Sequence, residues 1–211
     1  MKSNNLAEHE SRNNQFFGKW AWLYDYEKYL LSPMRKKAVN FLDLPPNQKI
    51  LDVATGTGAQ AYEFAKLGHE VLGIDLSEEM LLQARKKCTP NLQLNFQHID
   101  ATKMPFGSNS FDTSSISWGL HDMPYEVEML VLQEMKRVTK KSGQILIVDY
   151  MEPKNHLIAK FFHPLACIYE TQNYKPYINR GLDSILDKVG LNISKSTNFL
   201  GFVQISLVVN S

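Results

Sequence analysis

The amino-acid sequence predicts an α/β fold, a doubly wound, seven-stranded and mostly parallel sheet. From Lys49 onward, short apolar strand patterns alternate with helical patterns, and this alternation favours parallel strands joined by right-handed crossovers. An aromatic, helical segment precedes the alternation, and two strand patterns around Gly201 close the chain as an antiparallel hairpin. The 211 residues, of which 44% are apolar and 21% charged, are typical of one globular domain.

The strand and helix boundaries follow from local signals along the chain. The Pro45-Pro46 pair ends the first helix, Gly68 ends the next one, and Ser77 supplies an N-cap for the third. A turn at Ser142-Gly143 opens the fifth strand. The expected strands are residues 49–53, 70–74, 92–99, 111–117, 143–150, 191–199 and 202–210. The expected helices are residues 34–42, 58–68, 77–88, 126–139 and 179–189.

The domain organisation is simple. Residues 1–14 are polar and aperiodic, which is typical of a flexible tail. Residues 15–211 are expected to form a single domain, in which residues 15–46 make a helical cover dense in aromatic side chains. Residues 151–180 interrupt the alternation of strands and helices with a further aromatic stretch, and we expect this insertion to act as a lid over a substrate.

Charge and cysteine content narrow the function classes. The 23 Lys and Arg residues against 22 Asp and Glu residues give a net charge of +1, which offers no electrostatic reason to expect a nucleic acid or an anionic membrane as partner. Two cysteines, Cys88 and Cys167, cannot form a disulfide framework or a four-ligand zinc site. The N-terminus lacks the apolar core of a signal peptide, and no apolar stretch is long enough to span a bilayer. We therefore expect a cytoplasmic protein with a small neutral ligand and no metal.

The most informative segment is ILDVATGTGAQA, an apolar strand that ends near Asp52 and runs through a glycine loop into a helix. Gly56 and Gly58 allow the backbone to approach a ligand closely, and the first N–H groups of the helix attract an anionic group. Together with Ala61, these glycines also satisfy the G-x-G-x-x-G/A fingerprint of dinucleotide-binding proteins. This segment alone therefore leaves NAD binding open.

Three acidic residues at the ends of successive strands help to separate the nucleotide classes. The carboxylate of Asp52, four residues before Gly56, suits a cationic group better than a pyrophosphate. Asp75 ends the second strand, where a carboxylate can accept hydrogen bonds from both hydroxyls of a ribose, as in both nucleotide classes. Asp100, followed by Ala101, comes after the third strand, where it can accept a hydrogen bond from an adenine amino group. We expect these acids to form one ligand-facing row.

Five motifs then occur in a fixed order: LDVATGTG, GIDLSEEML, IDATKMPFGSNSFD, ISWGLHDMP and LQEMKRVTKKSGQILIVDY. In order and spacing they resemble those of the class I S-adenosylmethionine-dependent methyltransferases, and the resemblance runs from about Phe16 to the C-terminus. Ala54 stands where the first motif usually has Gly, as in the ubiquinone and menaquinone C-methyltransferases, whose ISFGL-like stretch matches ISWGL here. The resemblance implies a Rossmann-like methyltransferase fold and a methyltransferase activity.

The resemblance also implies S-adenosylmethionine as cofactor and S-adenosylhomocysteine as product. The loop residues would wrap the methionine part, and Asp75 would bind the ribose. Leu76 and Met80 would flank the adenine, while Tyr24 and Asp25 would help to cover the cofactor. The implied cofactor-binding residues are Tyr24, Asp52, Ala54, Thr55, Gly56, Thr57, Gly58, Asp75, Leu76, Met80, Asp100, Ala101 and Ser117.

The expected chemistry is an in-line displacement, which requires alignment in a dry pocket but neither a metal nor a covalent intermediate. A methyl acceptor with an acidic proton would need a base, and His121 is preferred over Asp122, Tyr150 and His163 because it follows the fourth strand. Aromatic residues of the cover, the insertion and the fourth strand end favour a small, apolar or aromatic acceptor, although they equally suit packing of the cover on the sheet. They are Phe16, Phe17, Trp20, Trp22, Trp118, Phe161, Phe162 and Tyr169.

Four alternatives stay open at this point. His121-Asp122 argues against a quinol acceptor, because the ubiquinone and menaquinone enzymes usually carry Arg-Asn there. An NAD-dependent oxidoreductase is disfavoured, because the Tyr24 and Lys28 pair lies in the helical cover rather than on a helix beside the sheet. A nucleic-acid methyltransferase is disfavoured because no Asn-Pro-Pro-Tyr-like motif follows the fourth strand. A non-catalytic cofactor-binding module remains possible in principle.

Overall fold

The computed structural model describes residues 31–153 and 171–210. The chain divides into two compact units, Met1–Ala101 and Thr102–Ser211, called here the N-terminal and the C-terminal unit. The expected tail, half of the expected helical cover and most of the expected insertion lie outside the described residues. The same holds for Tyr24, Asp25, His163 and Cys167.

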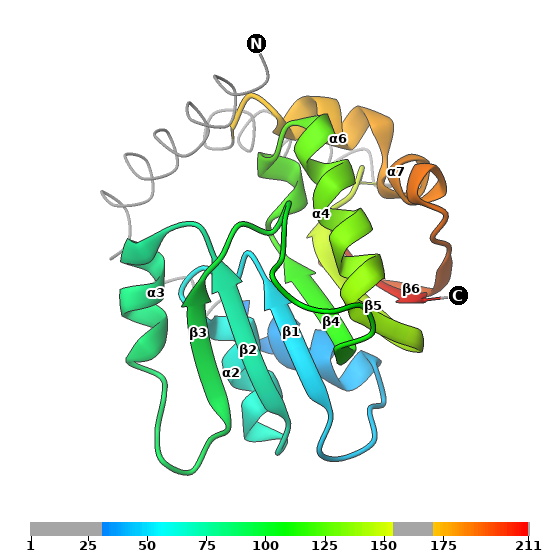
Figure 1. Ribbon diagram of the computed structural model, residues 1–211. Coiled ribbons are helices and arrows are strands. Elements are labelled where there is room, and N and C mark those ends of the chain that lie inside the picture. The colour runs from blue at the N-terminus through cyan, green and yellow to red at the C-terminus, as the bar shows by residue number, and fades with distance from the viewer. Residues whose placement is uncertain (1–30, 154–170, 211) are drawn as a thin grey trace. The chain divides into compact units, whose positions relative to one another are not determined.

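The N-terminal unit contains three parallel strands in the order β3-β2-β1. After a helix over residues 31–41, its elements are β1 (Lys49–Val53), α2 (Ala59–Lys66), β2 (Glu70–Asp75), α3 (Glu78–Arg85) and β3 (Leu94–His98). Helix α2 packs against β1 and β2, and α3 packs against β2 and β3 (Figure 1). These elements confirm the predicted alternation of strands and helices.

The register of these strands brings their carboxyl ends to one edge. Val53 pairs with Ile74, and Asp75 pairs with His98, so the segments that follow β1, β2 and β3 start side by side. The predicted N-cap of α3 is confirmed, because the hydroxyl of Ser77 accepts a hydrogen bond of 3.3 Å from the backbone N–H of Met80.

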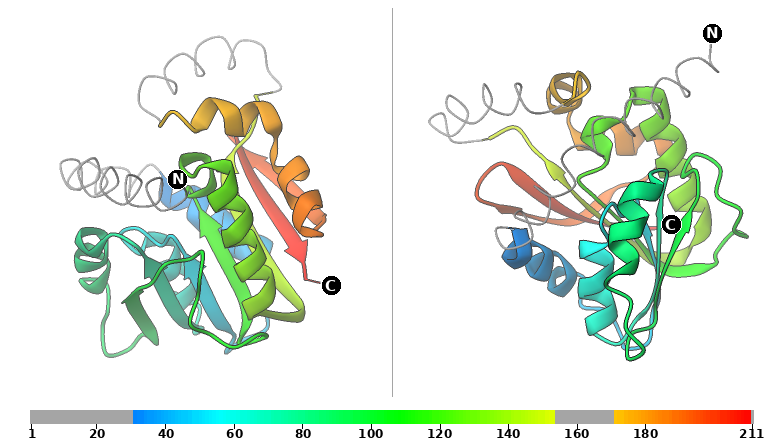
Figure 2. Two further views of the ribbon diagram at one scale, coloured as in Figure 1. Left: turned by 45° about the horizontal axis from the view of Figure 1, so that its top comes forward. Right: turned by 90° about the vertical axis from the view of Figure 1, so that its left-hand side faces the viewer.

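The C-terminal unit contains four strands in the order β4-β5-β7-β6. Its elements are β4 (Phe111–Ser117), the 3₁₀ turn η1 (Leu120–Asp122), α4 (Tyr125–Val138), β5 (Thr139–Tyr150), α6 (Tyr174–Arg180), α7 (Leu182–Val189), β6 (Ile193–Phe199) and β7 (Val203–Val209). Strand β4 is parallel to β5, whereas β7 is antiparallel to both β5 and β6. The predicted C-terminal hairpin is therefore confirmed, and it appears in orange and red in Figure 2.

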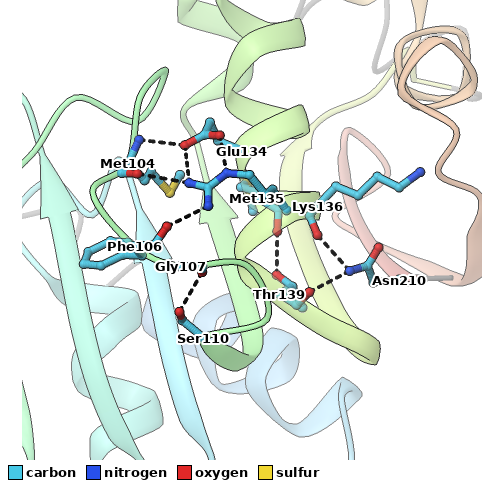
Figure 3. Close-up of polar contacts among 10 residues, drawn as sticks. Met104, Phe106, Gly107, Ser110, Glu134, Met135, Lys136, Thr139 and Asn210 are labelled. Atoms are coloured by element: carbon cyan, nitrogen blue, oxygen red, sulfur yellow. Dashed lines mark hydrogen bonds and ion pairs between the residues drawn. The ribbon is translucent and has the colours of Figure 1, made fainter.

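The last turn of α4 ties the segment before β4 to the unit (Figure 3). The guanidinium of Arg137 donates hydrogen bonds to the backbone oxygens of Phe106, at 2.6 Å, and Met104, at 3.0 Å. The same guanidinium is paired with Glu134, whose carboxylate accepts the backbone N–H of Met104 at 2.7 Å. This arrangement fixes the start of the unit against one helix.

Several boundaries differ from the prediction by a few residues, and two of the differences have a structural cause. The predicted helix over residues 179–189 is divided in the structure between the end of α6 and the whole of α7. The division falls at Gly181, whose φ of 73° and ψ of 153° are not helical. Strand β5 begins at Thr139 rather than Gly143, since Thr139 already pairs with Phe111 before the register shifts. Within the described ranges, no helix has both the length and the apolar character needed to cross a membrane.

Candidate functional site

The glycine loop after β1 has a left-handed backbone at three positions. Ala54, Gly56 and Gly58 have φ values of 50°, 54° and 73°. A Cβ atom added to Gly58 would lie 2.4 Å from Cζ of Phe96, so this glycine is required by packing. A Cβ added to Gly56 would meet nothing within 4 Å among the described residues. The backbone at Gly56 therefore has room beside it for a ligand.

Asp52 holds the shape of this loop. Its side chain is buried, with 1% of the residue exposed, and its carboxylate accepts a 2.6 Å hydrogen bond from the hydroxyl of Thr55. The backbone N–H of Thr55 donates to the carbonyl of Ile74 on β2 at 3.0 Å. The structure thus gives Asp52 a positioning contact with the loop, while its predicted contact with a cationic group stays a prediction.

Asp75 joins the end of β2 to the glycine loop. One carboxylate oxygen accepts the backbone N–H of Gly56 and the other accepts that of Ser77, both at 2.8 Å. Burial raises the pKa of Asp75, and the backbone hydrogen bonds act in the opposite direction. The backbone of Leu76 also acts on this carboxylate, and the predicted contact of Asp75 with a ribose stays a prediction.

The end of β3 brings the third predicted acid to the same edge. The backbone N–H of Ile99 donates to the carbonyl of Asp75 at 3.1 Å, so Asp100 and Ala101 follow directly beside the end of β2. Both residues are partly exposed, as is Leu76, whereas Met80 is buried at 6% exposure. The structure therefore brings the predicted cofactor-binding residues that it describes in this unit to one edge.

The start of α2 offers N–H groups that no side chain caps. Its N-cap is Gly58, and the first turn carries no acidic residue. The loop before it is held from the other side, because the ammonium of Lys87 donates to the carbonyl of Thr57 at 2.7 Å. Uncapped N–H groups at a helix start favour an anionic ligand group.

In the C-terminal unit, a strained residue follows β4. Trp118 has φ 59°, which is rare for a bulky side chain and costs about 1–3 kcal/mol, and its backbone N–H donates to Val148 at 2.8 Å. The hydroxyl of Ser117 and the indole N–H of Trp118 are buried and have no hydrogen-bond partner among the described residues. Buried polar groups are nearly always hydrogen-bonded, so these two call for a partner such as a water molecule or a ligand group.

His121 lies in the 3₁₀ turn η1 and contacts Asp149 near the end of β5. The distance from His121 Nδ1 to Asp149 Oδ1 is 2.7 Å, and both residues are buried, at 3% and 2% exposure. The other ring nitrogen, Nε2, lies 3.6 Å from a carboxylate oxygen of Asp122. The preferred candidate base is thus flanked by two carboxylates.

Aromatic rings surround this pair in edge-to-face contacts. The ring of Tyr150 lies 4.8 Å from that of His121, 4.6 Å from that of Trp118 and 5.0 Å from that of Tyr174, measured between centroids. Tyr177 is buried below them, its hydroxyl has no partner among the described residues, and burial raises its pKa well above the usual value. Of the aromatic residues predicted to favour an aromatic ligand, Trp118 alone is described.

Sequence reasoning missed Asp149, Glu128 and Arg180. The guanidinium of Arg180 donates to both carboxylate oxygens of Glu128 at 2.6 Å, and Glu128 is buried at 1% exposure. Burial raises the pKa of Glu128 to about 7 in spite of Arg180. An acid that ends an apolar strand, as Asp149 does in ILIVDY, was the available signal for that residue.

Part of the chain is similar in sequence to known protein families. A family model described as a methyltransferase domain matches residues 50–143. The demethylmenaquinone methyltransferase of Paenarthrobacter aurescens is 35% identical over 158 residues, which cover 75% of this chain and 56% of that protein. A ubiquinone/menaquinone biosynthesis C-methyltransferase of Bdellovibrio bacteriovorus is 35% identical over 142 residues, or 64% of this chain and 60% of that protein. The chain thus spans less than two thirds of either relative.

Solved structures share the fold at low sequence identity. The magnesium protoporphyrin IX methyltransferase of Synechocystis, solved with bound S-adenosylhomocysteine, has a TM-score of 0.71 at 17% identity and covers 98% of this chain and 100% of that one. A methyltransferase from Aquifex aeolicus has a TM-score of 0.65 at 19% identity, covering 84% and 89%. These likenesses confirm the predicted fold class. Residues 50–143 of the chain are thus similar to a methyltransferase domain, and the chain shares the fold of solved methyltransferases.

Proposed function

We propose that the protein is an S-adenosylmethionine-dependent methyltransferase that acts on a small, apolar or aromatic molecule. The observation that carries the proposal is the glycine loop after β1, whose left-handed backbone at Gly56 is held by a hydrogen bond to Asp75. A loop of this shape exposes backbone to a ligand and keeps a carboxylate beside it. The names of the relatives, all of them methyltransferases, support the same activity.

The residues of the N-terminal unit fit this cofactor. The space beside Gly56 and the uncapped start of α2 suit the amino-acid end, whose carboxylate is attracted by N–H groups. Asp75 keeps acceptor positions for the ribose hydroxyls. Leu76 and Met80 offer apolar contacts for the adenine ring, and Asp100 lies where it can accept the adenine amino group.

The bound cofactor would supply a methyl group on a positively charged sulfur. The chain would then have to orient the reacting groups and exclude water, because the displacement itself needs no covalent help from the protein. Asp75 would orient the ribose, and Asp52 would act through Thr55 by keeping the loop in its binding shape. Asp52 is therefore a positioning residue in this proposal.

A quinol is the second candidate for the methyl acceptor. Two relatives carry names from quinone biosynthesis, and the aromatic rings at the ends of β4 and β5 suit a flat aromatic molecule. The buried Ser117 hydroxyl and Trp118 indole N–H would satisfy oxygen atoms on such a ring. This chain has His121-Asp122 where those enzymes usually have Arg-Asn, so different side chains would contact the acceptor here.

Calorimetric titration of the full chain with S-adenosylhomocysteine, S-adenosylmethionine and NAD tests the cofactor first. Binding of the first two at micromolar concentration, without binding of NAD, is expected. Asp75→Asn should weaken that binding, and the matched exchange Asp112→Asn, on the surface pair with Lys140, should leave it unchanged. Binding of NAD alone would overturn the proposal, and binding of none by folded protein would favour a degenerate or partner-dependent module.

A further inference from the structure

We propose that Asp149 is a positioning residue that fixes His121 as the general base for an aromatic methyl acceptor carrying an acidic hydroxyl. The inference rests on the proposed function and assigns the proton transfer to a pair of residues within the C-terminal unit. Asp149 and His121 lie 28 residues apart in the sequence and meet because β4 and β5 are parallel neighbours. The hydroxyl-bearing class includes phenols and quinols.

The carboxylate of Asp149 makes four hydrogen-bond contacts. Its Oδ1 atom accepts from the backbone N–H of Tyr150 and faces Nδ1 of His121, both at 2.7 Å. Its Oδ2 atom accepts from the backbone N–H groups of Leu120, at 3.0 Å, and His121, at 3.3 Å. Three backbone N–H groups therefore donate to the two oxygens, and we assign Asp149 as the acceptor toward Nδ1 of His121 as well.

This bonding fixes the tautomer of His121. An acceptor-only carboxylate requires that the Nδ1 atom of the imidazole carries a proton and donates it. In the neutral ring, Nε2 then holds the lone pair, which is the requirement for a base. The two backbone bonds from Leu120 and His121 fix the position of the ring as well as its protonation. One carboxylate thus controls both the chemistry and the orientation of the imidazole.

The surroundings of the pair suit an aromatic hydroxyl compound. The edge-to-face rings of Trp118 and Tyr150 are partly exposed beside the buried His121. Asp122, whose carboxylate oxygen lies 3.6 Å from Nε2, would stabilise the imidazolium after it has taken a proton. Among the described residues, the titratable or charged groups around the pair are Asp122, Tyr150, Tyr174, Tyr177, Glu128 and Arg180.

The proposed step is a single proton transfer. The O–H bond of the methyl acceptor breaks, its electron pair stays on the oxygen, and the proton binds to Nε2 of His121. The acceptor becomes a phenolate, which is a stronger nucleophile at the oxygen and at the ring carbon beside it. The imidazolium later loses the proton to water, so the base is restored and no further reactant is needed.

Proton NMR of the full chain tests the pair without any ligand. The wild-type protein should show a far-downfield imidazole N–H resonance, because this proton lies in a buried charge-assisted hydrogen bond. His121→Gln and Asp149→Asn should both lose it, and Asp112→Asn should keep it. Persistence of the resonance in folded Asp149→Asn would overturn the proposed pairing.

Turnover of 1,4-naphthalenediol, kept reduced, tests the role of the pair. Asp149→Asn should lower kcat at least about 100-fold while the affinity for S-adenosylhomocysteine stays at the wild-type value. Added imidazole should restore part of the turnover of His121→Ala. Unchanged kcat in Asp149→Asn, with normal cofactor binding, would refute the positioning role and leave the proposed function intact. No turnover by the wild-type protein would refute the hydroxyl-bearing acceptor, and absent cofactor binding would refute the proposed function itself.

Discussion

The glycine loop of the N-terminal unit and the His121 region of the C-terminal unit are held by different kinds of contact. Around the loop, the contacts are largely made by backbone groups: Gly56 donates to Asp75, and Thr55 donates to Ile74. Around the ring of His121, the contacts with described residues come from side chains: the carboxylates of Asp149 and Asp122, the indole of Trp118 and three tyrosine rings. Both regions follow the carboxyl ends of parallel strands.

This difference predicts different responses to substitution. A backbone-built loop depends on φ angles and on space, so only exchanges that change these should damage it. A cluster of buried ionisable side chains depends on charge balance, so its stability should vary with pH. Substitutions that add volume are thus expected to destabilise the glycine loop, and substitutions that remove a charge are expected to destabilise the His121 region.

The largest effect is expected at the ion pair of the buried Glu128 and the partly exposed Arg180. Arg180→Met should lower the free energy of unfolding by about 3–5 kcal/mol near pH 8, because it leaves a buried carboxylate without its partner. Burial has raised the pKa of Glu128 from 4.5 to about 7, so the folded protein holds this proton more tightly than the unfolded chain. The stabilisation from Glu128 is therefore complete below about pH 4.5 and is lost as the pH rises through 7.

Chemical denaturation of wild-type protein and Arg180→Met near pH 5.5 and near pH 8 measures this effect. The loss in the variant should be clearly smaller near pH 5.5, where Glu128 is protonated. Glu128→Gln should remove the pH dependence between these two values. An equal loss at both pH values would show that the charge of Glu128 does not determine the stability lost with Arg180.

A somewhat smaller effect is expected from added volume in the glycine loop. Gly58→Ala should destabilise the protein by about 2–4 kcal/mol, since its Cβ would collide with Phe96 in a left-handed backbone. Gly56→Ala, the matched control, meets no neighbouring atom and should cost about 1–2 kcal/mol from φ alone. Thermal unfolding of both variants checks the order, and equal costs would contradict the packing argument.

The third effect concerns the cofactor rather than stability. Asp75→Ala should weaken the binding of S-adenosylhomocysteine by about 1.5–3 kcal/mol, through lost charge-assisted hydrogen bonds to the ribose. Calorimetric titration measures it, with Asp112→Asn as the control. An unchanged dissociation constant would refute the role of Asp75 in the proposed site.

The smallest effect is expected at the start of α3. Ser77→Ala removes the hydroxyl that caps the backbone N–H of Met80 and should cost about 1 kcal/mol of stability. Because Ser77 also donates its backbone N–H to Asp75, Ser77→Ala should leave that contact and the cofactor affinity unchanged. A large loss of affinity would show that the cap, and not only Asp75, shapes the loop.

The strands and the glycine loop of the N-terminal unit could be predicted from the sequence because their signals are local. Gly56, Gly58 and Asp75 belong to short motifs whose spacing is visible in the chain. The contact between His121 and Asp149 depends on the pairing of β4 with β5, and no local pattern reveals which acid meets which histidine. The break at Gly181 was missed for a different reason, because the helical periodicity of the residues after it was extended back across the glycine.

The four hydrogen bonds on Asp149 have a consequence for the motion of the segment after β4. A connection between a strand and a helix usually opens easily, and its amide protons then exchange rapidly with solvent. Here the amides of Leu120, His121 and Tyr150 all end on one buried carboxylate. None of them can be released alone without leaving a buried charge partly unsatisfied. These three amides should therefore exchange together, at a rate set by the opening of β5 rather than by fluctuations of the turn itself.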